Sequence, residues 1–373
     1  MPMRATRSRL AAALVAAGTV CSILVTPGIA SAHSGMTTVA RGLDSPRGLA
    51  FGPDGSLYVA EAGSGGTAPC FDGPEGGRVC FGTSGAISKI SHGRAWRVVR
   101  GLPSIGDEGT GTNAIGPSDV AFRGHNLYFT VGLGADPALR AGLPPVGQRA
   151  SGWLLRDKRH GVRQVADVAG FEATANPDGG LPDSNPQSVL TTHRGQLVAD
   201  AGGNSLVRVS QSGRMSTVAT FPDQLVDAPP FLGLPPGTKI PMQAVPTSVV
   251  RGPDGGYYVG TLTGFPFQVG SARVYRVVPG RAPTVYAGGF TNVIDIAFGP
   301  DRRLYVLEIA HHGLLSGDPT GALLEAGRHG SHRIVASTGL NTPGGLAIRG
   351  RSAYVSNCGT CPDNGSVVRI PLR

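Results

Sequence analysis

The chain has 373 residues, of which 40% are hydrophobic and 15% are charged, and its formal net charge is +9. The positive charge is almost entirely arginine and is scattered singly along the chain. We therefore do not expect a nucleic-acid-binding surface, which needs clustered basic residues. The 58 glycines and 30 prolines argue against long helices.

The N-terminal segment predicts export. Three arginines within the first nine residues precede a mostly apolar run, 10–25, and small residues follow at 30–32. This order is typical of a secretory signal peptide, residues 1–32, that is cleaved after Ala32. The apolar run is shorter than a membrane-spanning helix, and no later segment is long and apolar enough to span a bilayer. We therefore expect a secreted, extracellular protein formed by residues 33–373.

One hairpin motif recurs six times along the rest of the chain. Its first copy begins at Pro46 with a short apolar strand, turns at residues 52–55 and ends with a second apolar strand at Glu61. The six copies occupy residues 46–61, 117–130, 186–200, 246–259, 293–308 and 343–356. In the first five copies, two further β-branched or apolar segments follow. This pattern predicts repeated four-stranded units.

The sixth copy is incomplete, and the missing piece lies at the other end of the chain. The sixth copy has a third strand at 365–370, but the chain stops before a fourth, whereas 36–43 matches the fourth-strand pattern. Closing the array by pairing the first strand with the last removes its exposed edge. The sequence therefore predicts an all-β fold, a single six-bladed β-propeller domain closed by an N-terminal strand that completes the last blade.

The lengths of the connections distinguish the two faces of the predicted propeller. Turns between first and second strands, and between third and fourth strands, are short, as at 52–55 and 91–94. The long connections follow second strands (62–84, 131–151 and 309–320) or join one blade to the next (101–116, 171–185 and 221–245). Both kinds emerge on the same face of a propeller, so we expect function at the channel mouth on that face.

Four cysteines remain after the predicted cleavage. An even number in an exported chain indicates disulfides, and four cysteines allow three connectivities. Pairing neighbours gives Cys70 with Cys80 and Cys358 with Cys361. A zinc site is the alternative, although the first spacing is wide for a pair of ligands.

The repeated motif from Pro46 to Gly55, together with the two cysteine pairs, resembles the exported ScyD/ScyE family over most of residues 36–373. That resemblance implies a six-bladed propeller and export, and it implies no specific activity. The chain is more distantly similar to gluconolactonase and regucalcin-like propellers, and to NHL-type and TolB-like ones. The gluconolactonase-like group holds one divalent cation at the channel mouth. Its ligand pattern implies Asp44, Asn185 and either Asn292 or Asp295 as ligands here.

Two acids occupy equivalent first-strand positions in the second and fifth copies. Asp119 and Asp295 would face each other across a sixfold ring. They could hold Ca²⁺ or another divalent cation, or act as an acid and base pair. The alternative is that each accepts hydrogen bonds from backbone amides where the blades pack.

A second group of candidates lies where second strands end. Glu61, Asp200, Glu308 and Asn357 would point toward the loop-rich mouth, unless they are merely solvated strand ends. His311 and His312 follow on a loop and could bind a metal or act as a base, or could simply be exposed.

These observations favour a secreted binding protein whose loop-rich face takes a small molecule, a glycan or a protein partner. We expect a monomer. A metal-dependent hydrolase or lactonase is the alternative, and a quinone-dependent sugar oxidoreductase is a more remote one.

Overall fold

The fold is known from a computed structural model that describes residues 35–73, 76–158, 161–327 and 330–372. The predicted signal peptide, residues 1–32, lies outside the described residues. The described chain is almost entirely β-structure, and its strands form six antiparallel blades of four strands each. The prediction of an all-β, six-bladed propeller is therefore confirmed.

Each blade contains the predicted hairpin followed by a second hairpin. Blade 1 comprises β2 (Pro46–Phe51), β3 (Leu57–Glu61), β5 (Arg78–Ser91) and β6 (Arg94–Asp107). Blade 2 comprises β7 (Pro117–Arg123), β8 (Asn126–Val131), β9 (Trp153–Lys158) and β10 (Gly161–Asp167). Blade 3 comprises β11 (Pro186–Thr192), β12 (Gly195–Asp200), β13 (Ser205–Val209) and β14 (Met215–Thr220). Blade 4 comprises β17 (Pro246–Arg251), β18 (Tyr257–Thr261), β19 (Ala272–Val277) and β20 (Thr284–Phe290). Blade 5 comprises β21 (Val293–Phe298), β22 (Leu304–Glu308), β23 (Ala322–Glu325) and β24 (Arg333–Ala336).

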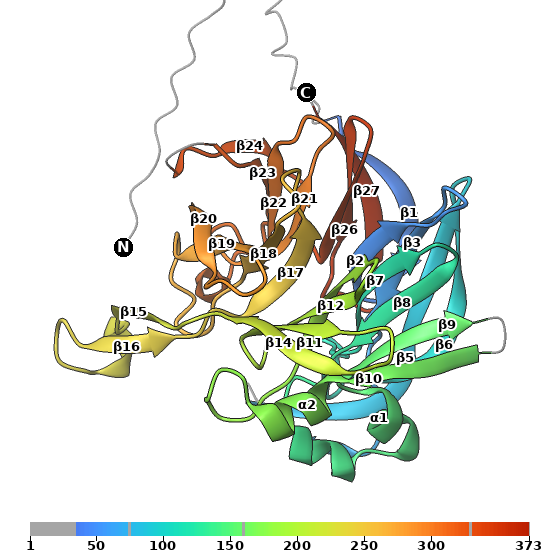
Figure 1. Ribbon diagram of the computed structural model, residues 1–373, viewed down its shortest axis with the longest axis horizontal. Helices are drawn as coiled ribbons and strands as arrows, with labels where there is room; N and C mark the ends of the chain where they lie inside the picture. Colours follow the sequence, from blue (N-terminus) through green and yellow to red (C-terminus); the bar gives the residue numbers. More distant parts are fainter. Residues whose placement is uncertain (1–34, 74–75, 159–160, 328–329, 373) are drawn as a thin grey trace, which may run out of the picture. The chain divides into compact units, whose positions relative to one another are not determined.

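Blade 6 joins the two ends of the described chain. It comprises β25 (Gly345–Arg349), β26 (Ser352–Asn357), β27 (Gly365–Pro371) and β1 (Thr37–Leu43). Strand β1 pairs antiparallel with β27, and Thr37 lies opposite Arg369. The predicted closure by an N-terminal strand is confirmed, and Figure 1 shows β1 (blue) beside β27 (red).

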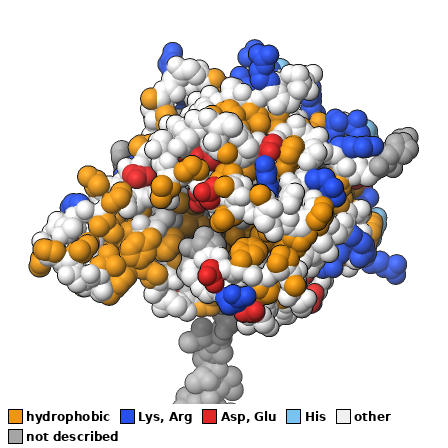
Figure 2. Space-filling model, turned by 90° about the horizontal axis from the view of Figure 1, so that it is seen from below, with side chains coloured by type: hydrophobic (Ala, Val, Ile, Leu, Met, Phe, Trp, Pro, Cys, Tyr) orange, Lys and Arg blue, Asp and Glu red, His pale blue; other side chains and the backbone are white. Residues whose placement is uncertain are grey.

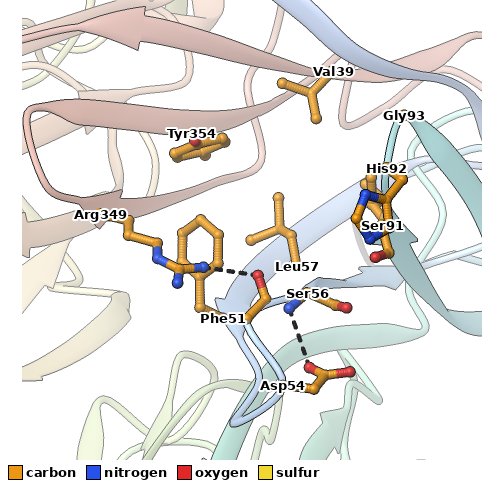
Figure 3. A pocket seen from close by; sticks show the side chains of 12 residues that line it. Val39, Phe51, Asp54, Ser56, Leu57, Ser91, His92, Gly93, Arg349 and Tyr354 are labelled. Atoms are coloured by element: carbon orange, nitrogen blue, oxygen red, sulfur yellow. Dashed lines mark hydrogen bonds between the residues drawn. The ribbon is translucent and has the colours of Figure 1, made fainter.

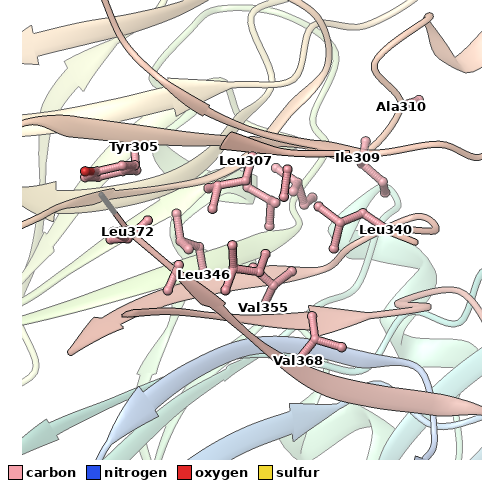
Figure 4. Close-up of a cluster of buried hydrophobic side chains, with 14 residues drawn as sticks. Tyr305, Leu307, Ile309, Ala310, Leu340, Leu346, Val355, Val368 and Leu372 are labelled. Carbon is pink, nitrogen blue, oxygen red and sulfur yellow. The ribbon is translucent and has the colours of Figure 1, made fainter. Parts of the chain in front are cut away.

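The first strands of the blades line the centre of the ring. Each first strand contacts the first strand of the next blade, in the order β2, β7, β11, β17, β21 and β25, and β25 contacts β2 in turn. Between each pair of neighbouring blades lies a cluster of buried apolar side chains. Figure 4 shows the cluster between blades 5 and 6, where Leu307 of blade 5 lies near Leu346 and Val355 of blade 6. Burial of apolar area between blades is therefore the main stabilising force of the ring.

Blade 1 departs from the sequence-based expectation. Residues 62–84 and 101–116 were expected to be connections, but β5 already begins at Arg78 and β6 continues to Asp107. The two strands extend beyond the blade as a hairpin, and the short strand β4 (Cys70–Asp72) pairs with β5. Glycine allows close packing here, since a Cβ on Gly82 would lie only 2.0 Å from the Gly65 carbonyl oxygen. The glycine-rich composition concealed this extension, because it resembles that of a loop.

Both expected disulfides are present. Cys70 pairs with Cys80 across the β4–β5 ladder, and Cys358 pairs with Cys361 just after β26. The nearest-neighbour connectivity is thus confirmed.

Other connections carry small elements of their own. The segment between β8 and β9 contains η1 (Pro137–Gly142) and α1 (Pro145–Ala150), and α2 (Val168–Ala175) follows β10. The connection from blade 3 to blade 4 forms a hairpin of β15 (Gln224–Asp227) and β16 (Lys239–Met242), with η2 (Pro230–Leu232) between them. In the part of the chain that the structure describes, every helix is too short or too polar to cross a bilayer.

Candidate functional site

The loop-rich face carries an exposed apolar surface built from three connections. The first is the hairpin β15–β16, which connects blade 3 to blade 4. The second is the segment 262–271, which follows β18, and the third is the segment 309–321, which follows β22 and contains η3 (Leu314–Ser316). We call the exposed apolar side chains of these segments the apolar patch: Leu225, Phe231, Leu232, Leu234, Phe265, Val269, Leu314 and Leu315. Figure 2 shows hydrophobic side chains gathered on the projecting part at the left, where β15 and β16 lie in Figure 1.

Contacts between the three segments make the apolar patch continuous. The rings of Phe231 and Phe265 lie 6.2 Å apart, edge to face. Gln224 Nε2 donates to the Ser271 carbonyl oxygen over 3.1 Å. Val269 lies against the backbone of Gly313, since a Cβ there would be 2.9 Å from Val269 Cγ2. Phe231 is 68% exposed and Leu225 is 73% exposed, so these side chains are not covered by the rest of the described chain.

The residues at the ends of the second strands are buried and hold the main chain. Glu61, Asp200 and Glu308 are each only 1% exposed. Each accepts a backbone N–H from one or two residues before the first strand of its own blade: from Asp44 at 2.7 Å, Asn185 at 2.6 Å and Thr291 at 2.7 Å. In blade 6, Asn357 accepts the N–H of Asn341, four residues before β25, at 2.7 Å. Their shared contact fixes the entrance of the first strand, so the solvated alternative for these carboxylates is wrong.

Further partners neutralise or satisfy these acids. Arg97 pairs with Glu61 at 3.1 Å, and Ser184 Oγ donates to Asp200 over 2.7 Å. Burial raises the pKa of Asp200 to about 6. Burial also raises the pKa of Glu308, while the hydrogen bond from His311 opposes that shift.

The two candidate histidines are engaged by carboxylates. His311 Nδ1 bonds Glu308, and His312 Nδ1 lies 2.7 Å from Asp318. Both contacts hold the 309–320 loop, which also carries Leu314 and Leu315 of the apolar patch.

Asp119 and Asp295 line a central cavity of about 10 Å³ that has room for about one water molecule. Asp119 accepts the N–H groups of Val120 at 2.8 Å and Val189 at 2.9 Å, and the Ser188 hydroxyl at 2.8 Å. Asp295 accepts N–H groups from Ile296 and from Leu346, both at 2.7 Å.

These contacts connect neighbouring blades. Asp119 of blade 2 bonds blade 3, and Asp295 of blade 5 bonds blade 6. Gly48 of blade 1 makes room for Asp119, because a Cβ there would lie 2.2 Å from its Oδ1. Burial raises the pKa of Asp119 to about 6. Burial, reinforced by the charge of Asp119, raises the pKa of Asp295 well above its usual range. The hydrogen bonds favour the structural alternative for both acids, since each carboxylate oxygen already accepts at least one donor.

The ligand pattern drawn from the gluconolactonase resemblance is spread over separate contacts. Asp44 is buried, accepts Ser64 Oγ over 3.3 Å and has a pKa raised by burial. Asn292 donates to the Leu262 carbonyl oxygen over 3.1 Å and accepts the Leu314 N–H over 3.0 Å. Asn185 Oδ1 is buried without a partner among the described atoms and lies against Gly132. The structure thus gives Asp44 and Asn292 packing roles between loops and blade ends.

One described group of three potential ligands does converge. Cys70, Cys80 and Glu108 have ligand atoms within 4.8 Å of one another. The sulfurs are joined in a disulfide, so they offer no thiolate to a metal ion.

A cluster of acids around α2 was missed in the sequence. Glu172 is 1% exposed, and its Oε1 has no partner among the described atoms. Burial, with the nearby charges of Asp200, Asp178 and Asp183, raises its pKa to about 7. Gly203 allows this approach, because a Cβ there would lie 2.4 Å from Glu172 Oε2. The sequence around Glu172 shows no strand pattern from which the orientation of its side chain could be predicted. The acids become neighbours only when blades 2 and 3 pack together.

The comparisons with known proteins concern the fold. No family model matches the chain, and no curated protein sequence matches it. Membership of the ScyD/ScyE family therefore stays a prediction. Among solved structures, a protein of unknown function from Bacteroides thetaiotaomicron is similar, with a TM-score of 0.52, 8% identity, and coverage of 90% of this chain and 75% of that chain.

Two further solved structures are named for an activity. Virginiamycin B lyase from Staphylococcus aureus has a TM-score of 0.48 and 11% identity, covering 91% of this chain and 99% of that one. A gluconolactonase from Xanthomonas campestris has a TM-score of 0.40 and 13% identity, covering 73% of this chain and 90% of that one. At these identities and TM-scores, neither likeness carries an argument about the chemistry of this chain.

Proposed function

We propose that the chain is a secreted binding protein whose loop-rich face docks a partner protein through the apolar patch. The observation that carries this proposal is the patch itself. Exposed apolar surfaces that are continuous over several segments mark interaction sites in soluble proteins. Phe231 and Phe265 are the expected anchors, since aromatic side chains dominate the energetics of protein interfaces.

The charges around the patch favour a protein over a membrane surface. The three segments contain one lysine, Lys239, against two aspartates, Asp227 and Asp318. Lys239 is paired with Asp227 at 2.8 Å. Binding to an anionic bilayer requires an excess of basic residues beside the apolar contact. The patch lacks that excess, whereas an apolar core with a polar rim is the usual composition of a protein interface.

Site-specific photo-crosslinking in the producing cells tests the proposal. A photoreactive phenylalanine analogue at position 231 is compared with the same group at position 98, which is also exposed but lies on the outer strand β6. We expect a protein adduct of discrete mass from position 231 that weakens when Phe265 is changed to Ser. Adducts of lipid mass, adducts with a second copy of this chain, or identical adducts from both positions would contradict it.

A metal-dependent hydrolase or lactonase is the second candidate. It is supported by Asp119 and Asp295, whose carboxylates share the central cavity. An ion there would have to use the lone pairs left over by the backbone and hydroxyl donors, together with water. Elemental analysis of the protein and hydrolysis of glucono-δ-lactone with added Ca²⁺ test this candidate. A stoichiometric ion that is lost in the Asp119→Asn, Asp295→Asn double variant would favour the enzyme over the binding protein.

A further inference from the structure

A cleft of about 390 Å³ lies between blades 6 and 1, on the face opposite the loop-rich mouth. Its walls come from the tight turns, with residues 54–56 between β2 and β3 and residues 91–93 between β5 and β6. A volume of this size is within the range of small-molecule sites. The apolar patch lies elsewhere, so the cleft is independent of the proposed function.

The floor of the cleft is apolar and aromatic. Leu57 is buried, and the rings of Phe51 and Tyr354 meet edge to face with centroids 5.0 Å apart. Phe51 belongs to blade 1 and Tyr354 to blade 6, so the closure of the ring creates this floor. Figure 3 shows both rings and Leu57 facing the open space.

The rim of the cleft has an excess of positive charge. Arg349 lies over the Phe51 ring, with its Cζ 4.9 Å from the centroid, and its Nη1 donates to the Gly55 carbonyl oxygen over 2.7 Å. Its Nε and Nη2 have no hydrogen bond within the described part of the chain. The carboxylate of Asp54 is already paired with Lys89 at 2.6 Å and with the Ser56 N–H at 3.1 Å. Arg349 therefore remains as an uncompensated cation beside an aromatic floor.

His92 faces Arg349 across the cleft from the β5–β6 turn (Figure 3). Ser91 pairs with Arg94, so His92 and Gly93 form a two-residue hairpin loop, and both have positive φ, 50° and 74°. Glycine and asparagine are usual at the first of these positions. A histidine there places an imidazole donor at the rim in place of a small turn residue.

We propose that this cleft binds a small aromatic carboxylate, with the carboxylate on Arg349 and the ring against Phe51 and Tyr354. The guanidinium offers two parallel N–H donors that match a carboxylate. The aromatic floor supplies stacking and apolar contact for the ring.

The experiment is a titration with benzoate, compared with benzyl alcohol, which lacks the charge, and with acetate, which lacks the ring. Affinities are measured by ligand-observed NMR at low ionic strength. We expect benzoate to bind about tenfold or more tightly than either of the others. Equal affinities for all three, or no saturable binding of benzoate, would overturn the proposal.

A matched pair of variants assigns the binding to the cleft. Arg349 ends β25 and bonds a carbonyl oxygen in the first turn of the next blade, and Arg123 ends β7 and likewise bonds the His193 carbonyl oxygen at 3.3 Å. We expect Arg349→Met to weaken benzoate binding about tenfold or more and Arg123→Met to leave it unchanged, with similar melting temperatures. If both variants weakened benzoate binding equally, the loss of one positive charge would explain the result, and the assignment of the site to Arg349 would be wrong.

Two further variants complete the test. Arg349→Lys keeps the charge but not the planar pair of donors, so we expect its affinity for benzoate to lie between those of the wild type and Arg349→Met. If Arg349→Met does not fold, Arg349→Lys replaces it as the test of the cleft. The Phe231→Ser, Phe265→Ser variant should bind benzoate as the wild type does. If it does not, the benzoate site is on the apolar patch and the cleft proposal fails, while the proposed function stands.

Discussion

At the scale of single residues, the buried carboxylates act as structural acceptors. Glu61, Asp200 and Glu308 occupy equivalent positions in blades 1, 3 and 5, and each receives the backbone N–H that leads into its first strand. Asparagine takes the same position in blade 6. A buried N–H without an acceptor is costly, so these side chains stabilise the entrances of the first strands in the four blades that carry them. Blade 2 has Val131 at the corresponding position, so not every blade uses this contact.

Glu172 gives a prediction about pH. Its folded-state pKa of about 7 lies above the ordinary value of 4.5, so the folded protein holds this proton between those two values. The tighter binding of this proton by the folded state stabilises the protein fully below pH 4.5, and this stabilisation is lost as the pH rises through 7. Glu172→Gln imitates the protonated form, and we expect it to be more stable than the wild type at pH 8 by about 1 to 3 kcal/mol.

Urea unfolding at pH 5 and pH 8 measures this difference. The advantage of the glutamine variant should be smaller at pH 5 than at pH 8. Glu108→Gln is the control, because Glu108 is half exposed and paired with Arg78 at 3.2 Å. An advantage of Glu172→Gln that is the same at both pH values would show that its carboxyl group does not titrate as described.

At the scale of elements, the extension of β5 and β6 beyond blade 1 is a separate substructure. It carries Phe81 and Ile105 into a small apolar cluster with Leu133, Leu143 and Ala169, away from the main interblade clusters. The disulfide between Cys70 and Cys80 fastens β4 to this extension.

Replacing Cys70 and Cys80 by serine should therefore act locally. The bridge closes a short loop, with a sequence separation of 10, so its removal costs about 2 to 3 kcal/mol at most. We expect faster amide hydrogen exchange in Cys70–Asp72 and in the outer part of β5, with the inner strands unchanged. Exchange that quickens uniformly around the ring would contradict this expectation.

At the scale of the whole molecule, closure between β1 and β27 decides stability. Ala40 and Leu43 of β1 are buried in the cluster between blades 6 and 1. Deleting residues 33–43 removes their burial and exposes the edge of β27, so we expect a loss of about 5 kcal/mol or more.

The matched control removes more residues from a connection. Gln224 lies opposite Met242 in the β15–β16 ladder, so residues 225–241 can be replaced by a two-residue glycine linker. Loop length itself has a small effect on stability, and this variant should melt near the wild type. Thermal unfolding compares the two variants. A lower melting temperature for the hairpin variant than for the deletion variant would show that closure by β1 does not decide the stability of the ring.

The fold could be predicted because its signal is periodic. Six hairpins and one displaced strand determine the ring, its closure and the face that bears the long connections. The surfaces could not be predicted in the same way. Glu61 at a strand end looks the same in sequence whether it faces solvent or a backbone N–H. Arg349 and Phe51 are almost 300 positions apart and meet only after closure.

That closure also sets an order of events during synthesis. Among the described strands, β1 is synthesised first and its partner β27 last, with Thr37 opposite Arg369. Because the chain is synthesised from its N-terminus to its C-terminus, β1 has no partner strand until β27 has been made. By then the residues of the first five blades are already available to fold. The ring, the apolar cluster between blades 6 and 1, and the cleft above it all become complete together, when the final strand arrives.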